Sequence, residues 1–147
     1  MNTANQNDPQ TSIDLRIRTM RTLWVGLLGS IGAYYVFTWF GEPGEKPNPN
    51  LSLTLVCVGM VIVLVTFLIK SKLLSKATEQ QNIGMVQQAY VVTWAINEVS
   101  ALLGLFDYFL TGNRYYYVLL IIAALGLLLH FPRREHVVNA AFRSPVM

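Results

Sequence analysis

The sequence predicts an all-α integral membrane protein, a bundle of four transmembrane helices with both termini in the cytoplasm. Three observations support this fold class. Apolar residues make up 53% of the 147 residues and charged residues only 13%, whereas soluble domains carry about 25% charged residues. The apolar residues gather in four runs close to the length that crosses about 30 Å of hydrocarbon, which takes about 20 helical residues. The basic residues flank these runs on one side, and the length suits one domain.

The four predicted spans are residues 22–40, 51–69, 89–110 and 115–131. The fourth is the shortest and is expected to stand upright or to extend beyond Pro132. All four are apolar around their circumference, which suits contact with lipid. Because hydrocarbon offers no hydrogen bonds to the backbone, each span is expected to be a helix. Polar residues precede the first span and no cleavage signal follows it, so we expect it to be retained.

The connections agree with this division. Residues 41–50, GEPGEKPNPN, contain proline and glycine residues that interrupt a helix, which predicts a surface loop. Residues 111–114, TGNR, are short enough to join spans three and four as a hairpin. Residues 70–88 lack proline and contain many helix formers, so they are expected to extend spans two and three, with a turn near Asn82 to Gly84.

The positions of Lys and Arg predict the orientation. Basic residues close to span ends favour the cytoplasmic side. Nine of the eleven precede span one, lie between spans two and three, or follow span four. The opposite side has Lys46 and Arg114. Both termini are therefore expected in the cytoplasm, and the location is expected to be the inner membrane of a prokaryotic-type cell.

Two flanking segments complete the predicted organisation. Residues 1–21 form a polar and basic arm, of which residues 1–12 have a composition typical of disorder, and residues 132–147 form a basic cytoplasmic tail. Ile13, Ile17, Met20 and Trp24 have helical spacing, which fits either an interfacial helix or a span that starts early. The candidate lipid-headgroup residues are Arg16, Arg18, Arg21, Arg133 and Arg134.

The sequence argues against several function classes. The basic residues flank apolar runs, whereas a nucleic-acid reader clusters them on a polar surface. Motifs typical of serine hydrolases, nucleotide-binding loops and zinc proteases are absent, and no enzymatic activity is expected. No metal site or cofactor is predicted, because the two histidines lack accompanying cysteines or clustered carboxylates. Cys57 lies inside a span and is expected to act as a small hydrophobe.

Glu98 lies near the middle of the third span, where charge is costliest. An ionised carboxylate at a helix centre costs about 2.5 to 3.5 kcal/mol on insertion scales. No Lys or Arg falls at the same depth on another span. We therefore expect Glu98 to keep its proton at neutral pH and to donate to Ser30, to a hydroxyl of Tyr34 or Tyr35, or to a backbone carbonyl.

Small residues fall at similar depth on the other spans and let helices approach closely. The predicted packing residues are Gly26, Gly29, Gly32, Ala33, Gly59, Ser100, Gly104 and Gly126. Three roles of Glu98 remain open at this point: a proton or cation site, a neutral clasp between helices, and a contact to a partner subunit or cofactor. Asp107 is expected to form an exposed ion pair with Arg114, and His130 to lie at the membrane interface.

The segment AINEVSALLGL, residues 95–105, resembles the ion-binding helix of the ATP synthase rotor proteolipid, subunit c. Ala95, Glu98, Ala101, Gly104 and Leu105 occupy the places of that family's motif. The resemblance implies a carboxyl that carries a proton or sodium ion. It does not extend to the family's glycine-rich inner helix, since the second span contains one glycine.

The sequence thus predicts a non-enzymatic accessory or structural subunit, embedded in the lipid bilayer, that forms a homo-oligomer or joins a larger membrane complex. The alternative is proteolipid-like proton or sodium translocation that uses Glu98.

Overall fold

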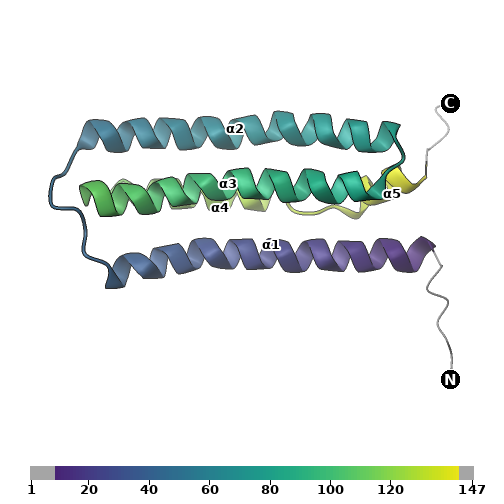
Figure 1. Ribbon diagram of the computed structural model, residues 1–147, viewed down its shortest axis with the longest axis horizontal. Coiled ribbons are helices and arrows are strands. Elements are labelled where there is room, and N and C mark those ends of the chain that lie inside the picture. Colours follow the sequence, from purple (N-terminus) through teal and green to yellow (C-terminus); the bar gives the residue numbers. More distant parts are fainter. Residues whose placement is uncertain (1–8, 143–147) are drawn as a thin grey trace, which may run out of the picture.

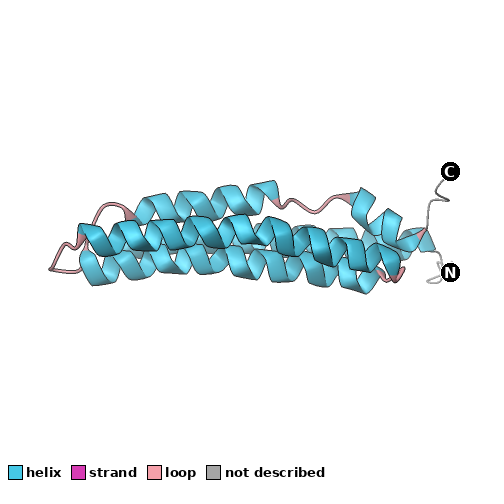
Figure 2. Ribbon diagram, turned by 90° about the horizontal axis from the view of Figure 1, so that it is seen from above, coloured by secondary structure: helices cyan, strands magenta, loops and turns pink. Residues whose placement is uncertain are grey.

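The computed structural model describes residues 9–142, which form five helices and no strand. The helices are α1 (Pro9–Phe40), α2 (Pro49–Glu79), α3 (Ile83–Thr111), α4 (Tyr116–Leu129) and α5 (Arg134–Ala141). Successive long helices run in opposite directions, and α5 lies at the end of the bundle where α1 begins (Figures 1 and 2). Within the described residues, three helices are long and apolar enough to cross a membrane, and the bent pair of α4 and α5 makes a fourth candidate if it counts as one span.

The two helices α3 and α4 lie between α1 and α2 (Figure 1). The loop from α1 to α2 therefore passes the end of α3. There the Gly44 amide donates to the Tyr108 carbonyl at 3.1 Å, and the Tyr108 hydroxyl donates to the Gly41 carbonyl at 2.8 Å. Gly112 ends α3 with a φ of 61°, a left-handed conformation that glycine adopts without steric cost, and its α-carbon faces the Gly44 carbonyl.

Asparagine residues cap the starts of α2 and α3. The Asn48 side chain accepts from the Leu51 amide at 3.1 Å, and the Asn82 side chain accepts from the Met85 amide at 3.3 Å. The predicted helical extensions of spans two and three are present, and the turn between them lies at residues 80–82. The connection at residues 112–115 joins α3 and α4 as a hairpin.

Buried residues on the long helices follow alternating steps of four and three, the spacing of helices that pack along a left-handed seam. On α1 the residues facing the bundle are Ile13, Ile17, Met20, Trp24, Leu27, Ile31, Tyr34 and Thr38. On α3 they are Val86, Tyr90, Thr93, Asn97, Ser100, Gly104, Asp107 and Thr111. The seam on α1 is apolar over most of its length, whereas the seam on α3 is largely polar and small.

The structure corrects part of the expected organisation of the flanks. Residues 1–8 lie outside the described range, but residues 9–12 belong to α1 and are helical rather than disordered. The arm is continuous with the first span, and its Ile13, Ile17 and Met20 are buried in the core. In the basic tail, α5 packs Val137 and Ala140 into the same core, and residues 143–147 lie outside the described range.

Candidate functional site

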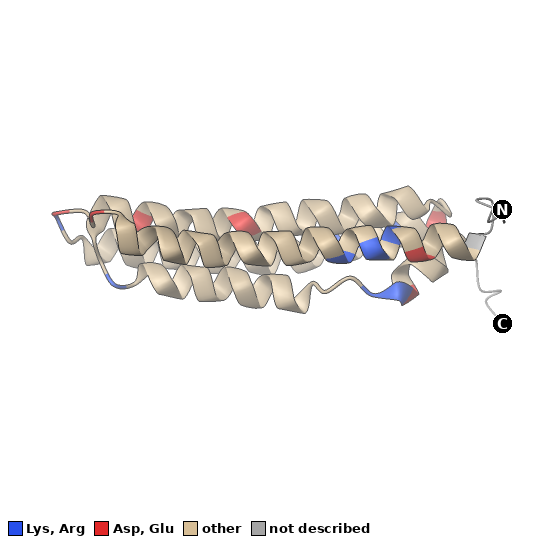
Figure 3. Cartoon of the chain, turned by 90° about the horizontal axis from the view of Figure 1, so that it is seen from below, with Lys and Arg blue, Asp and Glu red and all other residues tan. Residues whose placement is uncertain are grey.

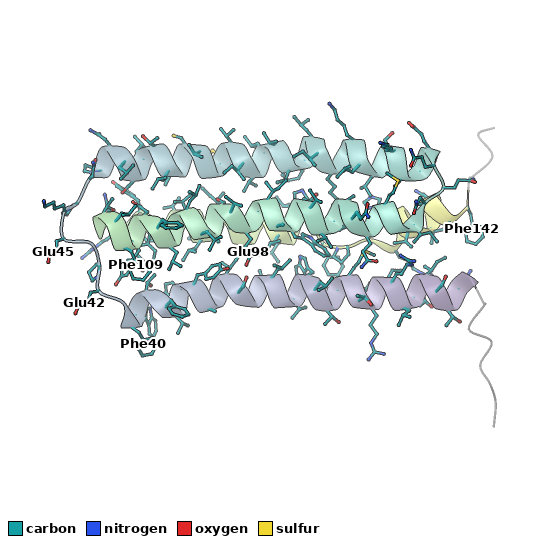
Figure 4. All side chains as sticks on the ribbon, in the orientation of Figure 1. Phe40, Glu42, Glu45, Glu98, Phe109 and Phe142 are labelled. Atoms are coloured by element: carbon teal, nitrogen blue, oxygen red, sulfur yellow. The ribbon has the colours of Figure 1, made fainter. Side chains whose placement is uncertain are left out.

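Glu98 lies about halfway along the bundle, between α3 and α1 (Figure 4). Its side chain is half-buried. α1 places two hydroxyls beside it, because Ser30 and Tyr34 are four residues apart on one helix face. The Ser30 hydroxyl lies 2.8 Å and the Tyr34 hydroxyl 2.7 Å from the same carboxyl oxygen, Oε1 of Glu98. These are two of the partners that the sequence suggested for Glu98.

The Ser30 and Tyr34 hydroxyls have one hydrogen each to donate near this carboxyl. The Ser30 Oγ also lies 2.7 Å from the Leu27 carbonyl oxygen. Three short contacts therefore join four oxygens in a row, from Tyr34 through Glu98 and Ser30 to Leu27. Each contact needs one hydrogen, and the two hydroxyls supply two. The Tyr34 hydroxyl donates to Oε1 of Glu98, and the Ser30 hydroxyl lies within donating distance of both Oε1 and the Leu27 carbonyl, so these two acceptors share the single Ser30 hydrogen.

The Glu98 cluster (Leu27, Ser30, Tyr34 and Glu98) joins α1 to α3. Among the described residues, no Lys or Arg forms an ion pair with Glu98, and the ion pair that these residues do form joins Arg134 to Asp14 near the cytoplasmic end predicted from the sequence. A carboxyl with two hydroxyl neighbours can hold two helices together or exchange a proton. The geometry allows both.

A second polar set lies inside the bundle, on the seam of α3. Asp107 was expected to be an exposed partner of Arg114, and this was wrong: the side chain is fully buried. Its Oδ1 accepts from the Ser52 hydroxyl at 2.7 Å and from the Thr111 hydroxyl at 2.9 Å. Asp107 therefore ties α3 to α2, and Arg114 is exposed nearby in the turn.

Further along this seam, Asn97 and Ser100 are fully buried without a hydrogen-bond partner among the described residues. Each lies against a glycine of a neighbouring helix. A β-carbon added to Gly126 would lie 2.7 Å from Oδ1 of Asn97, and one added to Gly59 would lie 2.7 Å from Oγ of Ser100. Gly104 approaches the backbone of α4, where an added β-carbon would lie 2.9 Å from the Tyr116 carbonyl oxygen. These small residues allow close approach of α2, α3 and α4.

The small residues of α1 lie elsewhere. A β-carbon added to Gly26, Gly29 or Gly32 would meet no neighbouring atom of the described residues within 4 Å, and Ala33 is exposed. These predicted packing residues do not contact another helix of the described chain, because α1 turns Ile17, Leu27, Ile31 and Tyr34 toward the core instead. The small residues are left on the outer side of α1.

His130 is also buried in the bundle. Its Nδ1 lies 2.6 Å from the Gly126 carbonyl, and its Nε2 lies 3.5 Å from the Thr66 hydroxyl. Nearby, the Tyr90 hydroxyl lies 2.6 Å from Nδ1 of His136. Burial, and then the positive charges of Lys70 and Arg133, lower the pKa of His136 in α5, which lies beyond the predicted spans. The neutral imidazole is therefore favoured there.

The structure separates the five candidate headgroup arginines. Figure 3 shows Lys and Arg mainly toward the end where α1 begins and α5 lies. Arg18, Arg21 and Arg134 line one groove. Arg16 lies on another face of α1, where its guanidinium is 3.5 Å from the Gln87 side chain. The Arg133 backbone amide donates to the Tyr90 hydroxyl at 3.1 Å.

Residues 9–142 contain no cluster of three or more His, Cys, Asp or Glu side chains suited to a metal ion. The positions that carry the likeness to the rotor proteolipid differ in exposure: Ala101 and Gly104 are buried, Glu98 is half-buried and Ala95 is exposed. Comparisons with protein-family models, with curated proteins and with solved structures find no match for this chain.

Proposed function

We propose that this chain is a small, non-enzymatic accessory or structural subunit of a membrane complex, embedded in an inner membrane as four spans with cytoplasmic termini. In this role it binds a second transmembrane helix, from another copy or from a larger assembly. The helix that makes the contact is α1. The Glu98 cluster then serves as a neutral clasp that keeps α1 on the bundle.

This proposal rests on the residues exposed on the outer face of α1. We define it by Gly26, Gly29, Ala33, Val36 and Phe40, which follow steps of three and four and are all exposed. A β-carbon added to Gly26 or Gly29 would have no atom of another described helix within 4 Å. Small residues at this spacing allow two membrane helices to pack closely. Gly59, Gly104 and Gly126 are already used in that way inside the chain, whereas Gly26 and Gly29 of α1 can receive a partner.

Substitution of Gly29 by leucine tests this contact. The protein is extracted in a mild detergent, and its mass is measured by light scattering together with the proteins that co-purify. The wild type is expected to run as an oligomer or with a stoichiometric partner, and Gly29→Leu as a single chain. Cys57→Leu is the control, because Cys57 is also exposed but lies on α2. A wild type that is monomeric without a partner contradicts the proposal, as does a Gly29→Leu variant that assembles normally.

A second candidate function is proton or sodium binding at Glu98. It is supported by the half-buried carboxyl with two hydroxyl neighbours and by the resemblance to the rotor proteolipid. Hydrophobic carbodiimides react with protonated carboxyls in membranes. An ion-carrying Glu98 is expected to react at acid pH, to lose its reactivity as the pH rises, and to be protected by sodium if sodium is the ion. Glu98→Gln is the unreactive control. Labelling that does not change with pH or sodium favours the clasp, and an absence of labelling excludes the ion site.

A further inference from the structure

A basic groove lies between α1 and α5 at the end of the bundle predicted to be cytoplasmic. Its volume is about 550 Å³, and its lining includes Arg18, Arg21 and Arg134 together with Asp14. Three arginines and one aspartate give the lining a formal charge of +2. Arg134 forms an exposed ion pair with Asp14 at 3.3 Å, while the Arg21 guanidinium lies 5.6 Å from the centre of the Phe131 ring.

An apolar groove continues on the same side of α1. Its volume is about 530 Å³, and it lies between α1 and α4. On α1 it is lined by Leu28, Ile31, Gly32 and Tyr35, and on α4 by Tyr117, Leu120, Ile121 and Ala124. The two grooves share one face of the helix, because residues 14, 18, 21, 25, 28, 32 and 35 follow steps of four and three, and all of them line one groove or the other.

We propose that these two grooves bind one anionic phospholipid, with its phosphate at Arg18 and Arg21 and an acyl chain directed toward the groove between α1 and α4. The guanidinium groups of arginine match a phosphate in charge and in planar hydrogen-bond geometry. The ion pair with Asp14 holds Arg134 at the rim and leaves Arg18 and Arg21 as the phosphate ligands. The apolar lining below them suits hydrocarbon and not a second charged group.

The depth of the two grooves fits this arrangement. Arg21 is the last basic residue before the first predicted span, so it lies at the level of the headgroups. Leu28 is seven residues further, which is about 10 Å along a helix. One leaflet of the hydrocarbon core is about 15 Å thick. An acyl chain that leaves the headgroup at Arg21 is therefore long enough to enter the apolar groove at Leu28.

The charge of the site is tested by native mass spectrometry of the full chain in detergent, titrated with phosphatidylglycerol and with phosphatidylcholine. The wild type is expected to bind one phosphatidylglycerol in preference to phosphatidylcholine. Arg18→Gln with Arg21→Gln is expected to weaken phosphatidylglycerol binding about 25-fold, since each basic residue near anionic lipid contributes about fivefold. Arg16→Gln with Lys72→Gln is the matched control, because it removes the same charge from other faces of the same end.

The apolar groove is tested separately by Gly32→Leu, which fills it without a change of charge, against Cys57→Leu at an exposed position of α2 that lines neither groove. Gly32→Leu is expected to weaken binding of the long-chain lipid, and Cys57→Leu to leave it unchanged. The proposal is overturned if phosphatidylcholine binds as well as phosphatidylglycerol or if the two double variants behave alike. It is also overturned if inorganic phosphate alone displaces the lipid completely at equal concentration, which would indicate a free-phosphate site.

Discussion

Replacement of Gly126 by leucine is expected to destabilise the bundle by about 3 kcal/mol, the upper part of the range for overpacked cores. Gly126 lies where α4 meets α2 and α3. An added β-carbon would lie 2.7 Å from Oδ1 of Asn97 and 3.1 Å from Cγ1 of Val63. Leucine adds three further carbons beyond that point, so one of the three helices has to move outward.

The measurement is reversible unfolding in mixed detergent micelles, followed by circular dichroism. Cys57→Leu is the control, because it introduces leucine at an exposed position of α2, away from the packed glycines. We expect the free energy of unfolding of this control to equal that of the wild type. If the two variants lose equal stability, the packing of α4 against α2 and α3 described above is incorrect.

Replacement of Glu98 by leucine is expected to cost about 1 to 3 kcal/mol, because the Ser30 and Tyr34 hydroxyls lose their shared partner. The lower end agrees with the loss of two hydrogen bonds at the average of about 0.6 kcal/mol each between membrane helices. Glu98→Gln is expected to stay close to the wild type, since an amide still offers both an acceptor and a donor.

The same unfolding experiment separates these two variants. A neutral clasp predicts a clear loss for leucine and little change for glutamine. A destabilisation by glutamine as large as that by leucine would show that the negative charge, or the carboxyl proton itself, is required. Tyr34→Phe is expected to fall between them, because it removes one of the two hydroxyl contacts.

The sequence predicted the helices well because long apolar runs and proline-rich or glycine-rich loops are strong local signals. It also predicted two partners of Glu98, since Ser30 and Tyr34 lie on the first span at matching depth. The rotation of each helix was not predicted. The spans were read as apolar all round, yet Thr93, Asn97, Ser100, Gly104, Asp107 and Thr111 follow steps of four and three on one face of α3. That spacing was visible in the sequence and marks the buried seam.

Two further features, the partner of Asp107 and the neighbours of the α1 glycines, could not be predicted from the sequence. Asp107 was paired with Arg114 because the two are close in sequence, but its position on the α3 seam directs it to Ser52 on α2. The glycines of α1 were predicted to pack against other helices because small residues allow close approach. Such residues indicate that a helix approaches something closely, but they do not say whether the neighbour belongs to the same chain.

Infrared spectroscopy of the protein in lipid tests most directly whether Glu98 is a protonated clasp. A difference spectrum between the wild type and Glu98→Gln isolates the carboxyl of this residue, since Asp107 contributes equally to both. The clasp predicts a carbonyl stretch of a protonated acid at neutral pH, shifted by hydrogen bonding and altered again in Ser30→Ala. The absence of that band, with the stretches of an ionised carboxylate in its place, would contradict the account.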